Sequence, residues 1–320
     1  MFISVLICTR NRAESLRLTL DSLFLPTNLQ FRDWEAVVVD NDSVDHTGQV
    51  CRDLRERFPE HFRTVVERKH GKSNALNAAI AAARGDILAF TDDDVLCASD
   101  YLQGIRTVFR QHMADGVQGR VLLDCEGGHP DWLDRFLGLT VGWRDEGDQV
   151  TDLAGTLCGT NMVLRADVFR KISGFLPDLG PGLIGLGEET ELSLRMRQAG
   201  CRLLYAPQIL IRHRLPRNRL TKAFIRKRFF QQGRAEAYYE RLPSSLLRFG
   251  LWVIKETMVN EAAAAGHLCG GHPALALRTQ CEARAHAGFF WQHWLFKRGA
   301  ARRLSGNPVS ASEVEARLPK

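Results

Sequence analysis

The stretch Asp86-Ile87-Leu88-Ala89-Phe90-Thr91-Asp92-Asp93-Asp94 decides the fold of this chain. Its apolar residues predict a short buried strand, and three adjacent carboxylates stand at the end of that strand. Like charges in a partly desolvated place are costly unless a positive group compensates them. A divalent cation is the usual solution, because Mg²⁺ takes oxygen ligands from carboxylates and phosphates. The alternative is a solvated turn or a helix N-cap, since Asp favours both.

Strand patterns alternate with helical patterns around this stretch. The strands are expected at 3–9, 34–40, 63–67 and 86–91, and the helices at 11–23, 44–58 and 73–84. We expect Ser73 to cap the last of these helices and Gly85 to end it. The alternation predicts an α/β fold with a mainly parallel sheet and helices on both faces. Because ligands of such sheets bind at the carboxyl ends of the strands, polar residues at those ends should share one rim. These residues are Thr9, Arg10, Asp40, Asn41 and the three acids 92–94.

Length and composition restrict the class of protein. A chain of 320 residues forms one large domain with appendages, or two domains. The apolar segment 1–8 is short and lacks a basic start, so we expect a first strand and not a signal peptide. No apolar run is long enough for a membrane span. Eight scattered cysteines are typical of reduced thiols in a cytosolic protein.

The net charge of +6 is unevenly distributed. No acid occurs from Leu192 to Ala235, a segment that is rich in Arg and Lys. Such a block favours an anionic partner, which could be a nucleotide, an anionic lipid or a nucleic acid. A solvated basic face is the alternative. No G-x-G-x-x-G or Walker-type motif follows a strand, which disfavours ordinary dinucleotide or P-loop binding.

Taken together, several short motifs resemble the family 2 glycosyltransferases. Each piece is weak alone, but their order and spacing along residues 3 to 234 are specific. The pieces are 5–12 (VLICTRNR), 38–43 (VVDNDS), 71–77 (GKSNALN), 90–94 (FTDDD), 159–162 (GTNM) and 187–195 (GEETELSLR). The resemblance implies the A-type glycosyltransferase fold, a Rossmann-like mixed sheet. It also implies transfer of a sugar from a nucleotide-diphosphate donor with inversion at the anomeric carbon.

The resemblance also implies roles for residues at the rim. Asp92 and Asp94 match the two acids of the family's Asp-x-Asp motif, and His213 stands where a histidine completes the metal shell in many relatives. Mn²⁺ or Mg²⁺ is the implied cofactor, with Asp94, Asp92 and His213 as its protein ligands. The implied nucleotide-binding residues are Thr9, Arg10, Arg12, Asp40, Asn41, Lys72, Asp92 and Asp93. His213 could instead be a surface histidine among arginines.

Catalysis requires a base that deprotonates the acceptor hydroxyl as it attacks. Glu188 and Glu189 are adjacent, and successive residues of a helix point about 100° apart, so the two carboxylates face different ways. The family motif at this point is Glu-Asp with the second residue as base, which implies Glu189 for this role. The glycine-rich segment 180–187 before it is expected to be a mobile loop over the acceptor. Alternatively, these acids only favour a first helical turn.

Further polar residues are expected at the acceptor or the phosphates. They are Asn161, Arg226, Arg228 and Arg234, together with Lys227, Gln231 and Gln232. The Gln-x-x-Arg-Trp motif of processive relatives is absent, which favours transfer of single sugars.

The chain is expected to divide near residue 215. Residues 1–215 form the catalytic domain, with a nucleotide-binding half at about 1–97 and an acceptor-binding half at about 98–215. Residues 216–304 form a helical region in which an aromatic cluster at 289–296 is flanked by basic residues. This region fits a peripheral membrane contact or a homodimer contact, and the choice stays open. The polar tail 305–320 is expected to be disordered.

The leading hypothesis is therefore a metal-dependent, inverting, non-processive sugar transferase. Its partners would be a nucleotide-diphosphate sugar, with a UDP-sugar as first expectation, and a saccharide or lipid-linked acceptor, but no nucleic acid. By resemblance it would serve surface polysaccharide or exopolysaccharide biosynthesis in the cytoplasm, at the inner face of the membrane if the helices bind lipid. The alternatives are a sugar-phosphate nucleotidyltransferase and a non-catalytic module that recruits partners to a membrane.

Overall fold

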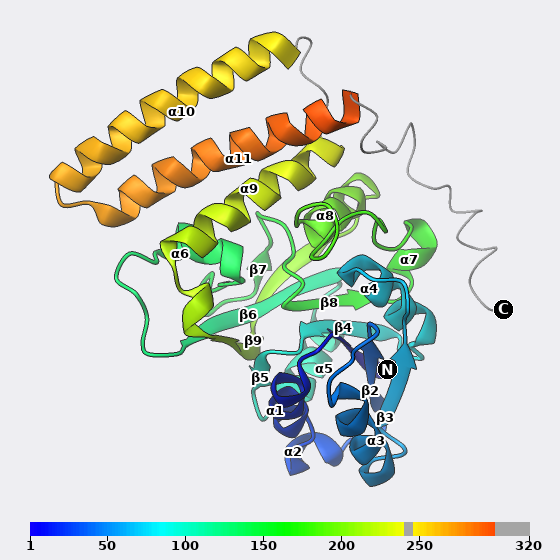
Figure 1. Ribbon diagram of the computed structural model, residues 1–320. Helices are drawn as coiled ribbons and strands as arrows, with labels where there is room; N and C mark the ends of the chain where they lie inside the picture. Colours follow the sequence, from blue (N-terminus) through cyan, green and yellow to red (C-terminus); the bar gives the residue numbers. More distant parts are fainter. Residues whose placement is uncertain (240–245, 298–320) are drawn as a thin grey trace.

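The structure is a computed structural model that describes residues 1–239 and 246–297. The described residues form one nine-stranded mixed sheet in the order β3-β2-β1-β4-β8-β6-β9-β5, and β7 pairs with β9 (Figure 1). β1 to β4 are parallel to one another, whereas β8 runs antiparallel to both of its neighbours. The strands are β1 (Ile3–Thr9), β2 (Trp34–Asp40), β3 (Phe62–Val66), β4 (Ile87–Asp92), β5 (Val95–Cys97), β6 (Gly116–Cys125), β7 (Thr151–Asp152), β8 (Asn161–Arg165) and β9 (Leu203–Leu215).

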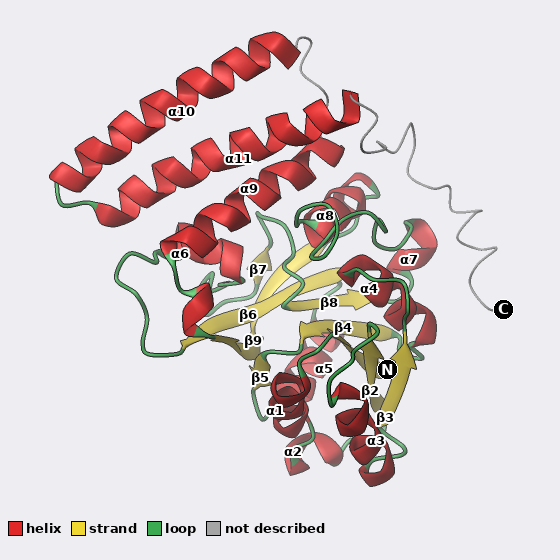
Figure 2. Ribbon diagram, viewed as in Figure 1, coloured by secondary structure: helices red, strands yellow, loops and turns green. Residues whose placement is uncertain are grey.

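Helices cover both faces of this sheet (Figure 2). Within residues 1–215 they are α1 (Ala13–Leu23), α2 (Pro26–Leu29), α3 (Thr47–Arg57), α4 (Lys72–Ala82), α5 (Tyr101–Gln111), α6 (Arg135–Gly138), α7 (Val168–Lys171) and α8 (Glu188–Gln198). The α/β fold with a Rossmann-like mixed sheet agrees with the expectation. Two local expectations differ at α4. It ends at Ala82 with Ala83 as its C-cap, before Gly85, and it begins after Gly71, so that Ser73 lies inside its first turn. The Ser73 hydroxyl donates to the carbonyl of Leu179 at 2.6 Å, so it ties a distant loop to α4 and does not cap the helix.

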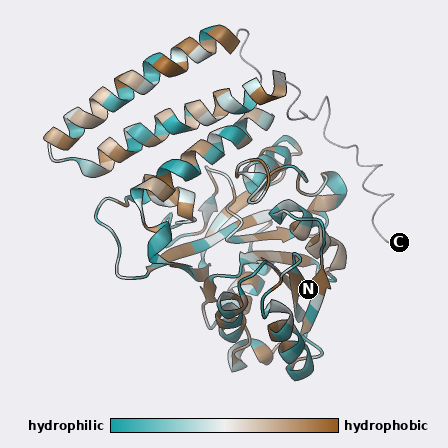
Figure 3. Cartoon of the chain, in the orientation of Figure 1, coloured by the Kyte–Doolittle hydropathy of each residue, from teal (hydrophilic) through white to brown (hydrophobic). Residues whose placement is uncertain are grey.

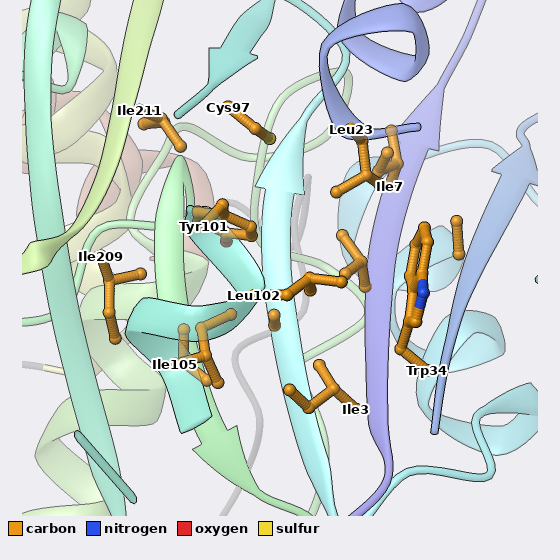
Figure 4. Packing of buried hydrophobic residues seen from close by; sticks show 14 of the residues in the cluster. Ile3, Ile7, Leu23, Trp34, Cys97, Tyr101, Leu102, Ile105, Ile209 and Ile211 are labelled. Atoms are coloured by element: carbon orange, nitrogen blue, oxygen red, sulfur yellow. The ribbon is translucent and has the colours of Figure 1, made fainter. Parts of the chain in front are cut away.

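The central strands are apolar at nearly every position because the sheet is buried on both sides. In β1, Ile3, Val5 and Ile7 belong to the core beside α1 and α5, and Leu6 belongs to the core beside α4. Figure 4 shows Trp34 and Tyr101 within the first of these cores. The register places Cys8 of β1 beside Asp92 of β4. The acids therefore lie next to the end of β1, at the rim where the sequence predicts a binding site.

The chain continues after β9 into α9 (Lys222–Tyr239), α10 (Leu246–Cys269) and α11 (Pro273–Lys297). α9 is the helix nearest to the sheet, α11 lies in the middle, and α10 is the outermost (Figure 1). We propose residue 215 as the boundary of the catalytic domain, because the last strand ends there. The expected disordered tail at 305–320 falls outside the described residues.

Two further expectations concern membranes and thiols. Among the described helices, none combines the length and the apolarity that crossing a bilayer requires. All eight cysteines lie in the described part and are free.

Candidate active site

A cavity of about 660 Å³ opens at the carboxyl ends of β1 and β4. Its walls also include the segment around the 3₁₀ turn Leu139–Val141, the loop before α8, and one side of α9. Most of the predicted site residues line it. They are Thr9, Arg10, Arg12, Asn41, Lys72, Asp92, Asp93, Asp94, Glu188, Glu189, His213 and Arg228. The topology therefore brings together motifs that lie far apart in residues 1–215.

Basic side chains surround the three acids. Arg12 forms ion pairs with both Asp93 and Asp94, and Arg219 donates to Asp94 at 2.8 Å. Thr9 donates to Asp93 at 2.7 Å. Burial raises the pKa of Asp93 to about 7, against the opposing effect of Arg12. The sequence predicts a cation that compensates these acids, and the structure shows that arginines supply part of that compensation.

Asp94 and His213 form a pair of donor atoms suited to a metal. His213 Nδ1 lies 2.8 Å from the carbonyl of Val141, which can only accept, so this nitrogen carries a hydrogen. His213 Nε2 then faces Asp94 Oδ1 at 3.3 Å, and both atoms are buried without a hydrogen-bond partner. Metal-binding histidines commonly donate their other N–H to a backbone carbonyl in this manner. Either a divalent cation or a doubly protonated His213 would satisfy both atoms.

The rest of a metal shell would have to come from elsewhere. No group of three or more His, Cys, Asp or Glu side chains in the described part of the chain is arranged to hold a metal. Asp92, the other predicted ligand, is engaged by Lys72, whose Nζ donates to it at 2.8 Å. Phosphate oxygens and water are the ligands that Mg²⁺ and Mn²⁺ sites of this kind recruit. Asp94 and His213 therefore fit a metal that is completed by substrate.

Lys72 connects the acids to the start of α8. Its ammonium also lies 3.7 Å from Glu188 Oε1. Burial alone would lower the pKa of Lys72, but the charge of Asp92 and the hydrogen bond to it raise this pKa well above its ordinary value. Burial, and then the charge of Glu189, raises the pKa of Glu188 to about 8, although Lys72 opposes this. Lys72 therefore remains charged, while Glu188 keeps its proton near neutral pH.

Glu189 lies in different surroundings from its neighbour. Its Oε2 is buried and has no hydrogen-bond partner. Gly159 comes close to both the Glu189 carboxyl and the Lys72 ammonium, because a Cβ added there would lie within about 4 Å of each. Arg228 lies nearby and donates twice to the carbonyl of Thr140, at 2.9 and 2.7 Å. Burial lowers the pKa of Arg228, and it has no acidic ion-pair partner among the described residues.

Buried contacts fix the loop before α8 and the first turn of that helix. Asn77 of α4 accepts from the N–H of Phe175 and donates to its carbonyl, both at 2.8 Å. Arg195 of α8 pairs with Glu191 and also donates to the carbonyls of Ser173 and Gly174. The start of the loop is therefore tied to both α4 and α8. This places the two glutamates at the cavity wall.

The other nucleotide-binding predictions lie at the outer rim. Arg10 Nη2 is 3.3 Å from His70 Nε2, and that ring nitrogen is 3.0 Å from Asp42 Oδ2. Asn41 lines the cavity, but its amide is fully used, since it donates to the carbonyls of Glu67 and Lys69 and accepts from Gly71. Asp40 accepts from the N–H of Ser43 and does not line the cavity.

Three residues predicted to contact acceptor or phosphate lie outside the cavity. Asn161 is fully buried under the sheet rim, where it donates to the carbonyls of Arg120 and Ile209. It fits there because Gly119 leaves room, as a Cβ on Gly119 would collide with the Asn161 amide. Arg226 donates to Gln280 and Arg234 to Gln292, so both join α9 to α11.

Other residues that line the cavity were not among the predicted site residues. Arg219 belongs to the basic block, but no motif distinguishes it from its neighbours, and its contact with Asp94 spans 125 positions. Arg144 and Thr160 also line the cavity. The signal that could have found Arg219 is its position a few residues beyond His213 on the same rim.

The fold is that of the A-type glycosyltransferases. The mannosyltransferase PcManGT from Pyrobaculum calidifontis, solved with GDP-Man and Mn²⁺, matches with a TM-score of 0.57 at 18% identity over 98% of this chain and 78% of its own. GalNAc-T7, solved with UDP, GalNAc and Mn²⁺, matches with a TM-score of 0.53 at 17% identity, over 74% of this chain and 51% of its own. S. aureus TarS 1-349, solved in complex with UDP, matches with a TM-score of 0.51 at 15% identity, over 97% of this chain and 95% of its own.

The chain belongs to glycosyl transferase family 2, whose model matches residues 4–173, just over half of the chain. The succinoglycan biosynthesis protein ExoM of Rhizobium meliloti is 29% identical over 73% of each chain. An uncharacterized glycosyltransferase of Nostoc, alr2836, is 33% identical over 42% of this chain and 40% of its own length. The probable glycosyltransferase YdaM of Bacillus subtilis is 26% identical, over 64% of this chain and 49% of its own.

Proposed function

We propose that this glycosyltransferase moves a single sugar from a nucleotide-diphosphate donor to a saccharide or lipid-linked acceptor, with inversion. One observation carries the proposal: the unpartnered atoms of Asp94 and His213 face each other in the same cavity as Glu189. An inverting displacement requires a base for the acceptor hydroxyl and positive charge at the departing diphosphate, and Glu189 and a cation at Asp94 and His213 would supply them. Family membership favours this reading over a nucleotidyltransferase or a non-catalytic module.

In this proposal the chain's own groups have distinct tasks. Asp94 and His213 would hold Mn²⁺ or Mg²⁺, which supplies positive charge for the departing diphosphate when bound. Arg12 and Arg219 orient Asp94 through their ion pairs with Oδ2. Arg228, which has no acidic ion-pair partner among the described residues, would bind an anionic oxygen of the substrates. Glu189 would accept the proton of the acceptor hydroxyl.

The donor and the setting are proposed in coarser terms. We retain a UDP-sugar as first expectation, although structures of this fold hold UDP or GDP-Man. The similarity to ExoM supports a place in exopolysaccharide or surface polysaccharide assembly. Eight free cysteines are typical of a reducing compartment, which supports the cytoplasm as the site of action.

Thermal unfolding with nucleotide diphosphates tests the proposal directly. UDP or GDP at 100 times its dissociation constant should stabilise the fold by about 2.7 kcal/mol. We expect this stabilisation to require Mn²⁺ or Mg²⁺ and to disappear with EDTA. Asp94→Ala should remove the metal-dependent part, whereas Asp53→Ala, an exposed acid of α3, should leave it unchanged. Equal nucleotide binding with and without metal would contradict the assigned metal site.

A further inference from the structure

A turn at residues 157–161, just before β8, forms part of the cavity wall. The residues of this turn that line the cavity are Leu157, Cys158 and Thr160. The N–H of Asn161 donates to the carbonyl of Cys158 at 3.2 Å and so closes the turn. A Cβ added to Gly159 would lie 3.5 Å from the Lys72 ammonium and 4.0 Å from the Glu189 carboxyl carbon. The position of the turn therefore restricts the space that the Glu189 carboxylate can occupy.

Ser193 joins this turn to α8, the helix that carries Glu189. Its hydroxyl accepts from the N–H of Leu157 at 3.0 Å and donates to the carbonyl of Glu189 at 2.6 Å. Serine hydroxyls inside helices commonly donate to the carbonyl four residues earlier, and this one also receives a donor from outside its helix. Ser193 is fully buried, so water does not compete for either hydrogen bond. One side chain thus links the backbone of Glu189 to the turn beside its carboxylate.

Gln118 of β6 joins the same turn to the sheet. Its amide oxygen accepts from the N–H of Cys158 at 2.6 Å, and its amide nitrogen donates to the carbonyls of Gly119 and Asn161 at 2.8 and 3.1 Å. Figure 3 shows that the central strands are largely hydrophobic, and Gln118 is fully buried among them. A buried amide costs free energy unless it is hydrogen-bonded, so an apolar residue is the ordinary choice at such a position. The turn that it holds explains the amide.

A third hydrogen bond ties the turn to the strand that carries the acids. Thr91 of β4 precedes Asp92, and its hydroxyl donates to the carbonyl of Thr160 at 2.8 Å. The turn is therefore hydrogen-bonded both to β4 and to α8. In an inverting displacement the acceptor hydroxyl must lie between its base and the anomeric carbon of the donor. A misplacement of about 1 Å can reduce the rate of such a reaction by about 10²-fold.

We propose that Ser193 and Gln118 are positioning residues for the transfer reaction. Together they hold the 157–161 turn between β4 and α8, and so fix the Glu189 carboxylate relative to the acids of the donor site. Neither side chain lines the cavity, so each acts through the turn. This inference rests on the proposed function, in which Glu189 takes the proton of the acceptor.

Hydrolysis of a nucleotide sugar provides the assay, with water in place of the acceptor. Water attacks the anomeric carbon, Glu189 takes its proton, and the bond to the nucleotide diphosphate breaks, so that the diphosphate leaves with the bonding electrons. The substrate is UDP-glucose, UDP-galactose or GDP-mannose with Mn²⁺, whichever the unaltered protein cleaves fastest. Calorimetric titration with UDP or GDP and Mn²⁺ measures nucleotide binding separately.

Ser193→Ala tests the link between the turn and α8. We expect kcat to fall by about 10- to 10²-fold, while the dissociation constant of the nucleotide stays unchanged. Ser22→Ala is the matched control, since the Ser22 hydroxyl also donates to a carbonyl of its own helix, that of Thr19, at 2.7 Å. It likewise accepts a backbone N–H from another segment, that of Cys97, at 2.9 Å. The control should keep its kcat.

Gln118→Met tests the link between the turn and the sheet. It keeps the length of the side chain and removes all three of its hydrogen bonds. We expect the same fall in kcat with unchanged nucleotide binding. Combining Ser193→Ala with Glu189→Gln should lower kcat by no more than about twofold below Glu189→Gln alone, because a residue that acts through the base has no effect once the base is lost.

The outcomes separate this inference from the proposed function. Full kcat in both Ser193→Ala and Gln118→Met, with a low kcat in Glu189→Gln, would overturn the inference and leave the proposed function standing. Equal losses of kcat and nucleotide affinity would show that the two residues serve only the fold. Independent losses in the combined variant would mean that Ser193 does not act through Glu189. Full kcat in Glu189→Gln would contradict the proposed base, and this inference with it.

Discussion

Glu188 and Glu189 show how adjacent residues acquire different chemistry. Glu188 is almost fully buried, and its burial and then the charge of Glu189 keep it protonated near neutral pH, although the Lys72 ammonium opposes this. Glu189 is partly exposed in the cavity and has a carboxylate oxygen without a hydrogen-bond partner. Exposure to the cavity is what distinguishes Glu189, since the two carboxyls still interact and the charge of Glu189 raises the pKa of Glu188. It favours Glu189 as the group that takes the acceptor proton.

Glu189→Gln should reduce kcat by about 10² to 10⁴, the range for a lost general base. Nucleotide binding should persist, because the side chain does not contact the Asp94–His213 pair. The measurements are steady-state kinetics and calorimetric titration with the nucleotide. Glu188→Gln is the matched control, since it copies a protonated Glu188 and should retain far more activity. Equal losses in donor affinity and turnover for Glu189→Gln would contradict its role.

The raised pKa of Glu188 predicts that the stability of the fold depends on pH. Its pKa is raised from about 4.5 to about 8 in the folded chain, so between these values the native state holds a proton that the unfolded state has lost. The contribution of Glu188 to the free energy of unfolding therefore falls as pH rises through this window, and is constant above it. Glu188→Gln lacks this contribution.

We expect the stability of Glu188→Gln, measured by urea unfolding, to improve relative to the unaltered protein as pH rises from about 4.5 to about 8. A difference that stays constant over this range would mean that Glu188 is ionised in the native state.

At the scale of elements, α9 and α11 approach closely where each helix has a glycine. A Cβ on Gly233 would collide with the carbonyl of Ala285, and one on Gly288 with the carbonyl of Phe230. Arg226 and Arg234 donate to Gln280 and Gln292 across the same contact. Two basic residues of the block therefore serve helix packing, while Arg228 of the same helix lines the cavity.

Gly233→Ala should lower the free energy of unfolding by about 1–3 kcal/mol, because the contact leaves no room for a methyl group. Gly266→Ala in α10 is the control, since nothing lies within 4 Å of its added Cβ. That substitution should raise stability by about 0.5–1 kcal/mol through helix propensity. Chemical denaturation of both variants tests these two expectations. An unchanged free energy of unfolding for Gly233→Ala would mean that α9 and α11 lie further apart than in this structure.

At the scale of the whole molecule, the cavity joins the sheet to the C-terminal helices. Phe224, Lys227 and Gln231 of α9 line it together with the strand ends. Ligands should therefore stabilise elements from both regions at once. α10 makes no part of the cavity wall among the described residues.

Hydrogen exchange with and without UDP or GDP and Mn²⁺ should show this coupling. We expect slower exchange in the loop before α8 and in the first half of α9, and no change in α10. Protection confined to the ends of β1 and β4 would show that α9 does not respond to the ligand.

Sequence reasoning located the central strands and the acids because these are local features. An apolar run that ends in polar residues identifies a buried strand and its rim wherever the strand lies in the sheet. Asp92 to Asp94, Thr9 and Lys72 meet in the cavity as expected. The same reasoning misplaced Ser73, whose hydroxyl reaches Leu179, because a capping signal does not exclude a long-range acceptor.

The amino-acid sequence by itself determined the α/β layout, the position of the carboxylates and the adjacent glutamates of α8, because periodicity and local motifs encode these. Only the tertiary structure decided which basic groups meet the acids, and that Asn161, Arg226 and Arg234 serve packing. Those choices depend on contacts such as Arg219 with Asp94 and on the space beside Gly119. Contacts between residues far apart in the chain, and the room left by an absent side chain, exist only after the chain has folded.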